Sequence, residues 1–460
     1  YYHDNWGRGD WTPPYLVMVN GGDQQANGTV YGGSIAGAYT FMDSDGNPLA
    51  PYADCTATLT FPYGGGSPAN NPACYDRTAT PVGSYRHTHY GKQRFGTTAD
   101  AAYRLGENNT IRAGLWWEDT TRDEYRSWHK VTDSRSDITY DETAYWRQYD
   151  RTFETDTLML YAEDTFEAGD FVLRGGVKKY FVDLKRIDNF GNEADQSLNS
   201  DSDVLFTAGA IYNATDNLEL FAGFSQNFAA IKDNVIEGSA SATNPDIPAL
   251  EGETADNFDF GVRFSNSWLR ATLTGYYIKF NNRITFVSAG DGTSGIDYLE
   301  EGEGAYLNVG GIKSKGLEAS ISADFAESWN FYSSLTINDS EYADTTADVV
   351  EGNKVALAPE FQLVGTVSYA KDGVRGGVSA KHVGSRYGDF ANTQELDSFT
   401  VVDAWLGYSL GEGLISGIQS IDISLNVTNL MDKRYLGGGT PGSYFIGANR
   451  QATANLTLKF

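Results

Sequence analysis

The closing residues of the chain alternate strictly between polar and apolar side chains. Residues 450–460 read RQATANLTLKF, where every second residue from Ala452 to Phe460 is apolar and the residues between are polar. A period of two predicts a β-strand with one apolar face. Soluble domains usually end in frayed, polar residues, whereas this chain closes on an aromatic ring. The pattern therefore raises the question of which solvent the apolar face meets.

The same alternation recurs from about residue 84 onward. Long alternating runs are joined in turn by a short polar stretch and by a longer polar loop of roughly 8 to 25 residues. The composition of the short stretches is that of hairpin turns. They lie at 105–109 (LGENN), 167–170 (EAGD), 213–217 (NATDN), 265–268 (SNSW), 326–329 (AESW), 370–373 (AKDG) and within 411–419.

This asymmetry of the connections predicts an all-β, antiparallel up-and-down transmembrane β-barrel, in which short turns lie at one end and long loops at the other. Counting back from Phe460 gives about fifteen strands, and Tyr1–Asn5 adds the outer end of one more. A β-propeller is the main soluble alternative, but no blade-length repeat is present. The predicted lipid face includes Phe258, Phe260, Val262, Phe264, Leu317, Ala319, Ile321, Leu425 and Leu456.

The composition agrees with a membrane protein built from strands. Hydrophobic residues make up 40% of the 460 residues, and no run of about 18 apolar residues occurs, so no transmembrane helix is predicted. Aromatic residues reach 13% and glycines number 51, as strands between lipid and a polar lumen require. The net charge of −27 argues against a nucleic-acid partner.

Residues 1–83 differ from the rest of the chain. The stretch 6–83 holds eight of the twelve prolines, which are excluded from central strands. We predict that 1–83 is the end of a strand followed by one long extracellular loop, and that 84–460 forms the barrel strands; a small separate domain is the alternative. Cys55 and Cys74 are predicted to form a disulfide in an oxidising compartment, with two free thiols as the alternative.

Several stretches resemble the TonB-dependent receptors, the gated outer-membrane transporters of Gram-negative bacteria. Each stretch alone is a weak signal, but they follow one another in the order of the family. The stretches are GFSQNFAAIKD (223–233), LEGETADNFDFGVRF (250–264), NVGGIKSKGLEASIS (308–322), NVTNLMDKRY (426–435) and RQATANLTLKF (450–460).

The resemblance implies a 22-stranded barrel that holds an N-terminal plug. Only about sixteen strands and no plug are recognised here, so the chain is expected to be the C-terminal part of a receptor, with an open or poorly sealed barrel. Because the outgoing partner of 84–105 is nearly absent, this segment is expected to be the weakest-paired long strand. The implied partners are outer-membrane lipid, the TonB complex through the missing plug, and a small ligand such as a ferric siderophore. A monomer without a cofactor is expected.

No catalytic constellation is recognised, so no enzyme is predicted. His87 and His89 share one face of a strand and could ligate a metal, but solvated surface histidines are the commoner explanation and no metal is predicted. Ligand contact is instead assigned to loop residues that are cationic or aromatic, since Arg pairs with anionic chelates and rings stack. An interfacial aromatic belt with ordinary loop charges is the alternative. The candidates are Trp6, Arg8, Trp11, Arg122, Tyr125, Arg126, Trp128, His129, Arg386 and Tyr387.

The function expected from the resemblance is import of a scarce nutrient across the outer membrane, with an iron–siderophore complex as the first expectation. Three alternatives stay open: a passive porin-type channel, TonB-dependent uptake of a carbohydrate or another nutrient, and a soluble glycan-binding β-protein.

Overall fold

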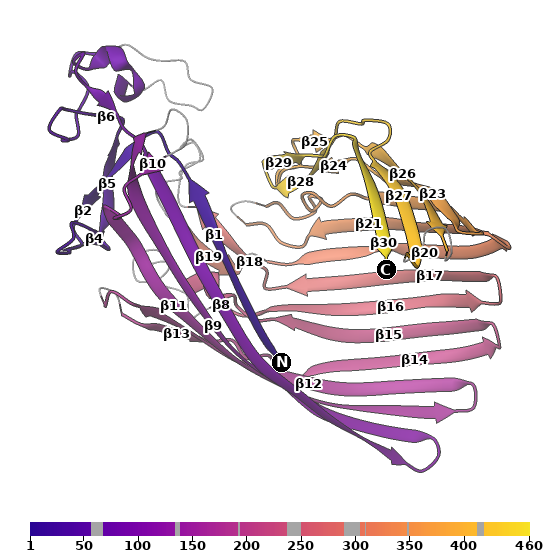
Figure 1. The fold of residues 1–460 in the computed structure, drawn as a ribbon. Helices are drawn as coiled ribbons and strands as arrows, with labels where there is room; N and C mark the ends of the chain where they lie inside the picture. Colours follow the sequence, from indigo (N-terminus) through magenta and orange to yellow (C-terminus); the bar gives the residue numbers. More distant parts are fainter. Residues whose placement is uncertain are drawn as a thin grey trace.

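A computed structural model describes residues 1–56, 68–133, 139–191, 194–236, 250–288, 304–308, 310–346, 349–411 and 418–460. One antiparallel sheet dominates these residues and curls round from the N-terminal to the C-terminal strands (Figure 1). Its long strands are β1 (Tyr2–Trp11), β8 (Ser84–Leu105), β9 (Asn109–Asp133), β11 (Trp146–Ala168), β12 (Phe171–Asp188), β14 (Leu205–Thr215), β15 (Leu218–Ala229), β16 (Glu253–Ser265), β17 (Leu269–Asn281), β20 (Ile312–Ala326), β21 (Trp329–Tyr342), β22 (Phe361–Lys371), β23 (Val374–Val383), β26 (Phe399–Leu410), β27 (Ser420–Thr428) and β30 (Gln451–Lys459).

Short strands and 3₁₀ helices lie at one end of this sheet, which we call the loop end. Four of them join the main sheet: β3 (Asp23–Gln24), β4 (Val30–Tyr31), β10 (Thr139–Tyr140) and β13 (Gln196–Asn199). The others are the strand pairs β2 (Leu16–Asn20) with β5 (Ser34–Tyr39), β6 (Phe41–Met42) with β7 (Thr80–Pro81), β18 (Ile284–Ser288) with β19 (Gly304–Asn308), β24 (Arg386–Tyr387) with β25 (Glu395–Leu396) and β28 (Leu436–Thr440) with β29 (Ser443–Ile446), and the 3₁₀ helices η1 (Pro68–Asn70), η2 (Pro72–Cys74) and η3 (Asp233–Ile236).

The predicted turns lie at the opposite end, which we call the short-turn end. Six of the seven join consecutive strands, from the β8–β9 turn to the β22–β23 turn; most of 411–419 lies outside the described residues. In the β22–β23 turn, Asp372 and Gly373 both have positive φ, of 49° and 81°. Two consecutive positive φ values are what a two-residue hairpin needs, and Asp-Gly adopts them readily. The turn chemistry therefore sets this connection locally.

One face of the sheet is apolar, as the alternation predicts. Phe258 pairs with Phe224 on β15 and with Tyr277 on β17, so large rings line up across three strands. Phe260 and Leu456 are 62% and 64% exposed. Burying such side chains in protein would be favourable, so their exposure in register over many strands marks a lipid-facing surface. The predicted lipid-face residues all share this apolar face, and the opposite face is the polar face.

The two ends of the sheet correct one expectation and agree with another. The first strand continues to Trp11 and pairs with β8 over ten residues, and β9 pairs with β8 from Ser84 to Leu105. The prediction that 84–105 is the weakest-paired long strand is therefore wrong. Within the described residues β1 pairs only with β8, and β30 only with β27. These two edges agree with the expected open barrel.

A disulfide joins Cys55 and Cys74 in the segment between β1 and β8, with 5.5 Å between their Cα atoms. The bond lies beside a small core of Phe41, Cys74 and Tyr75. Closing a loop of about 20 residues contributes on the order of 3 kcal/mol in the chain-entropy model.

Replacing both cysteines with serine should therefore raise the rate of hydrogen exchange around Phe41 and Tyr75, corresponding to a loss of about 3 kcal/mol in local opening free energy. Reduction of the unmodified protein should reproduce the effect, and exchange in β16 and β17 should not change. Unaltered exchange at Phe41 would show that the small core holds without the bond.

Candidate functional site

The strands β8, β9 and β11 are much longer than a bilayer requires. They contain 22, 25 and 23 residues, whereas about 9–11 residues cross a membrane. Tyr125 is sixteen residues from the first residue of β9, which is about 53 Å along the strand. The apolar band of an outer-membrane barrel is about 25 Å tall. The loop-end halves of these strands therefore stand clear of the membrane, and they carry most of the predicted ligand residues.

The predicted run 121–130 does not form one site, because neighbouring residues of a strand face opposite sides. Arg122, Arg126 and Trp128 lie on the polar face, whereas Tyr125 and His129 lie on the same side as the apolar face. The N-terminal candidates divide in the same way. Trp11 pairs with Arg86 and faces the polar side; Trp6 and Arg8 face the other side and are exposed.

On the polar face, an arginine–ring cluster is formed by Arg122, Arg126, Tyr149, Arg151 and Phe153. The guanidinium carbons of Arg126 and Arg151 lie 4.9 and 4.4 Å from the centroid of the Tyr149 ring. Arg122 lies 4.1 Å from the Phe153 centroid. A guanidinium group that stacks on an aromatic ring is held with its plane against the ring. The positive charges of these arginines are therefore fixed on the polar face. This arrangement suits oxygen-rich, anionic ligands.

Acidic side chains and a helical turn hold this cluster in place. The Tyr149 hydroxyl donates to Glu124 Oε1 at 2.8 Å, and Arg122 Nε donates to Asp233 Oδ2 at 2.9 Å. Asp233 opens η3, which packs Val235 and Ile236 against Phe153 and two β12 side chains. The connection after β15 therefore reaches across the polar face and fixes Arg122.

Trp128 occupies a different environment from the one predicted. Its side chain is fully buried, and its ring stacks on Trp146 with centroids 5.8 Å apart. Val17 of β2 packs against both indoles. Arg86 stacks on Trp11 at 4.8 Å and on Trp128 at 5.8 Å. Trp128 and Trp11 therefore belong to a core that attaches the β2–β5 segment to the loop end.

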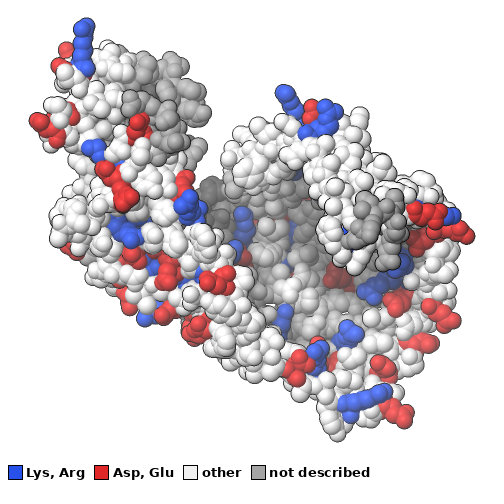
Figure 2. All heavy atoms as spheres, in the orientation of Figure 1, with Lys and Arg blue, Asp and Glu red and all other residues white. Residues whose placement is uncertain are grey.

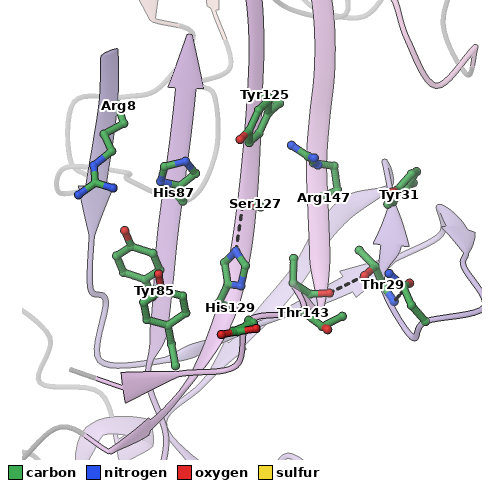
Figure 3. A pocket seen from close by; sticks show the side chains of 14 residues that line it. Arg8, Thr29, Tyr31, Tyr85, His87, Tyr125, Ser127, His129, Thr143 and Arg147 are labelled. Carbon is green, nitrogen blue, oxygen red and sulfur yellow. Dashed lines mark hydrogen bonds between the residues drawn. The ribbon is translucent and has the colours of Figure 1, made fainter. Parts of the chain in front are cut away.

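On the other side of the same strands, side chains line an outer pocket of about 540 Å³. Figure 3 shows Arg8, His87, Tyr125 and Arg147 across its width, drawn from β1, β8, β9 and β11. The other lining residues are Asn27, Thr29, Tyr31, Tyr85, Ser127, His129, Tyr140, Glu142, Thr143 and Ala144. The pocket thus combines aromatic rings, cations and hydroxyl groups, and it contains three of the predicted site residues.

Arg386 and Tyr387 lie far along the chain, in a C-terminal loop group made of the described parts of the β21–β22, β23–β26 and β27–β30 connections. Arg386 is buried, and its Nη2 donates to the carbonyl oxygens of Leu436 and Gly437 at 2.7 and 3.0 Å. The backbone oxygen of Tyr387 accepts from Leu357 N at 2.7 Å. Both residues join loops to one another in the structure.

Lys354 joins the β21–β22 loop to β21 through its ammonium group, and to the β23–β26 loop through its backbone. Lys354 Nζ lies 2.5 Å from Asp339 Oδ1, 3.0 Å from Glu341 Oε1 and 3.4 Å from Glu360 Oε1. Asn392 accepts from Lys354 N and donates to Lys354 O, at 2.7 and 2.9 Å. The hydrogen bond to Asp339, with help from Glu341, raises the pKa of the Lys354 ammonium.

Replacing Lys354 with methionine should loosen the β21–β22 loop by about 1 kcal/mol, because the ion pairs are partly solvated. A raised folded-state pKa means that the stabilisation is complete below the ordinary value of 10.5 and is lost as the pH rises above it. Hydrogen exchange of the loop should therefore be faster in the variant at pH 8. Lys371→Met, at the short-turn end, is the matched control. Equal exchange in both variants would contradict a joining role for Lys354.

The described residues contain no group of three or more His, Cys, Asp or Glu side chains placed to hold a metal ion. His87 and His89 stack with centroids 6.4 Å apart, and His87 Nδ1 contacts Asp10 Oδ1 at 2.8 Å. No described helix is long and apolar enough to span a bilayer.

Figure 2 shows charged side chains of both signs around a hollow that lies between the N-terminal and the C-terminal strands.

Sequence reasoning missed three of the five residues of the arginine–ring cluster. Tyr149, Arg151 and Phe153 lie in the run WRQYDRTF at 146–153, which has the same mixture of Arg and aromatic residues as 121–130. Composition could have identified this run. Only the pairing of β11 with β9 places the two runs side by side, with Arg126 opposite Tyr149 and Arg122 opposite Phe153.

Known proteins resemble this chain in sequence. A family model described as TonB dependent receptor-like, beta-barrel matches residues 1–430. The ferrichrome outer membrane transporter/phage receptor of Escherichia coli (strain K12) is 32% identical over 171 residues, which is 35% of this chain and 22% of that protein. The ferrioxamine B receptor of Salmonella typhimurium (strain SL1344) is 30% identical over 167 residues, 35% of this chain and 23% of that protein.

Solved structures share the fold. The unliganded ferric citrate transporter FecA matches with a TM-score of 0.63 and 16% identity, covering 83% of this chain and 57% of that one. The ferric preacinetobactin receptor BauA of Acinetobacter baumannii matches with a TM-score of 0.62 and 14% identity, covering 83% and 56%. The matched region is thus less than two thirds of the length of each of these proteins.

Proposed function

This chain belongs to the TonB-dependent receptor β-barrel family, and from this premise we propose that it is the barrel part of an outer-membrane receptor that imports an iron–siderophore complex. The family match over residues 1–430 carries the proposal. The relatives named above are a ferrichrome transporter and a ferrioxamine B receptor, which supports iron chelates as the substrate class. Members of this family lie in the outer membrane, and the exposed apolar face of the sheet fits that location.

The arginine–ring cluster supports a role in ligand contact. Its guanidinium groups lie on the polar face, near the loop end, where a ligand arriving from outside first meets the barrel interior. Guanidinium N–H groups donate well to the carboxylate, catecholate or hydroxamate oxygens that surround chelated iron. In the proposed mechanism the receptor makes and breaks no covalent bond. Energy transmitted through TonB moves the bound chelate inward, and the barrel residues supply affinity and selectivity.

Uptake of radiolabelled iron tests the proposal. Cells of the source bacterium that lack the gene for this chain should lose saturable uptake of at least one of ferrichrome, ferrioxamine B or a ferric catecholate under iron limitation. Uptake in the parent strain should stop when TonB is deleted. Undiminished uptake of all three complexes would refute the siderophore assignment, and uptake that persists without TonB would indicate a passive channel.

A pair of variants links the function to the cluster. Arg122→Gln combined with Arg126→Gln should raise the concentration for half-maximal uptake by about tenfold, as the loss of a charge-assisted hydrogen bond predicts. Arg104→Gln is the matched control, because Arg104 shares the polar face of β8 but lies at the short-turn end. An equal effect of both changes would assign the result to stability or surface charge.

A further inference from the structure

The outer pocket lies on the side of the sheet that faces away from the barrel interior. Tyr125, Ser127 and His129 have the same parity on β9 as Ile111 and Trp117, which belong to the apolar face. The proposed import route runs along the polar face, so a ligand in the outer pocket is not on that route. The pocket therefore needs an occupant of its own, and the inference does not rest on the proposed function.

The height of the pocket restricts what can reach it. On β9, β11 and β12 the last apolar row is Trp117, Leu158 and Phe181, and the next row is Asp119, Asp156 and Asp183. On β8 and β1 the exposed outward rings of Phe95 and Trp6 lie further toward the loop end. Tyr125 lies eight residues beyond Trp117, about 26 Å along the strand. With an ordinary strand tilt this leaves about 20 Å of height. A phospholipid headgroup layer is only about 5–8 Å thick on each side. A phospholipid is therefore too short, whereas a headgroup of several sugars, or a soluble saccharide, can reach the pocket.

Aromatic rings form much of the pocket wall. The rings of Tyr85 and Tyr140 stack with centroids 4.2 Å apart, and His129 contacts Tyr140 edge-on at 5.3 Å. Tyr125 presents a further ring beneath Arg147, whose guanidinium carbon lies 3.8 Å from the ring centroid. Rigid rings with polar edges suit sugar rings, which present C–H groups on a face and hydroxyls at the rim. Thr29, Ser127 and Thr143 add hydroxyl groups.

Two arginines and one carboxylate, Glu142, line the pocket, so its formal charge is positive. Arg8 is 61% exposed and lies 3.1 Å from Asp10. Arg147 Nη1 is buried without a hydrogen-bond partner among the described residues, 4.0 Å from Asp150 Oδ2. A buried guanidinium nitrogen that lacks an acceptor favours a ligand that brings one, most strongly a phosphate or carboxylate. The volume of about 540 Å³ is within the range of small-molecule sites, about 300–1,000 Å³.

We propose that the outer pocket binds an acidic saccharide, with a phosphate or carboxylate between Arg8 and Arg147 and sugar rings against Tyr85, Tyr125 and Tyr140. The saccharide is either the headgroup of a surrounding glycolipid or a soluble oligosaccharide. Both sources present the same chemistry to the pocket, and the experiment separates them.

Binding to the full chain, folded in detergent micelles, is measured by calorimetry. The acidic probe is the phosphorylated core oligosaccharide released from lipopolysaccharide, and the neutral probe is maltoheptaose. The acidic probe should bind at least about tenfold more tightly than the neutral one. Arg147→Gln should weaken acidic binding by about tenfold. Lys185→Gln, which removes a charge from the same face of β12 outside the pocket, should leave it unchanged.

Arg8→Gln keeps the test decisive if Arg147→Gln disturbs the fold, because Arg8 is exposed and its replacement should weaken binding without loss of structure. Tighter binding of intact lipopolysaccharide than of its released core would support a glycolipid source, and equal binding a soluble source. Equal affinity of wild type and both pocket variants for the acidic probe would overturn the proposal. So would binding of phosphatidylglycerol vesicles or inorganic phosphate as tight as that of the acidic oligosaccharide.

Discussion

Replacing Trp128 with alanine is expected to lower the free energy of opening at the loop end by about 3–5 kcal/mol, the range for large aromatic residues in cores. The indole is fully buried, stacks on Trp146 and contacts Val17. Its Nε1 donates to Gln148 Oε1 at 2.9 Å, so truncation also leaves a partly buried acceptor without its donor. Hydrogen exchange in β2, β5 and the loop-end half of β9 should increase together.

Trp268→Ala is the matched control, because Trp268 is 48% exposed at the short-turn end. Its replacement should not affect exchange at the loop end. If Trp128 instead served mainly in ligand contact, its replacement would weaken ligand binding and leave exchange in β2 and β5 unchanged. The two readouts therefore distinguish a core residue from a binding residue at a position where composition alone suggested binding.

The strands and short turns could be predicted because their causes are local. Alternation of side chains reports which residues share a face, and Asp-Gly at 372–373 encodes its own turn. The barrel fold then followed from the asymmetry between short turns and long loops. The lengths of the strands were harder to predict. Strand β1 continues through Trp11, although its loop-end residues do not alternate cleanly between apolar and polar. Pairing with β8 extends this strand.

The candidate site was less predictable, because its causes are non-local. Arg386 has the composition of a ligand residue, but two carbonyl groups from residues fifty positions away use its guanidinium. Trp128 and His129 are adjacent in sequence and reach a buried core and an open pocket respectively. The opposite case is Tyr149, which became part of the cluster only through its register opposite Arg126.

Replacing Ile321 with arginine should lower the free energy of unfolding in a lipid bilayer by about 2–4 kcal/mol, the cost of a cation near the midplane of an outer-membrane barrel. Ile321 lies on the apolar face, opposite Ala271 on β17 and Ser333 on β21. It is five residues from Ala326, where β20 ends at the short-turn end. Five residues of tilted strand span about 13 Å, which is close to the middle of an apolar band about 25 Å tall.

Ser320→Arg is the control that isolates the effect of lipid. Ser320 is the neighbour of Ile321 on the same strand and therefore points to the polar face, opposite Thr272 and Ser334. The same arginine would there meet water and polar side chains, so its cost should stay below about 1 kcal/mol. Denaturant titrations in bilayers of one composition would measure both variants. A large loss in free energy of unfolding from Ser320→Arg, with little loss from Ile321→Arg, would contradict this assignment of the two faces. The apolar face would then be the one that lines the interior.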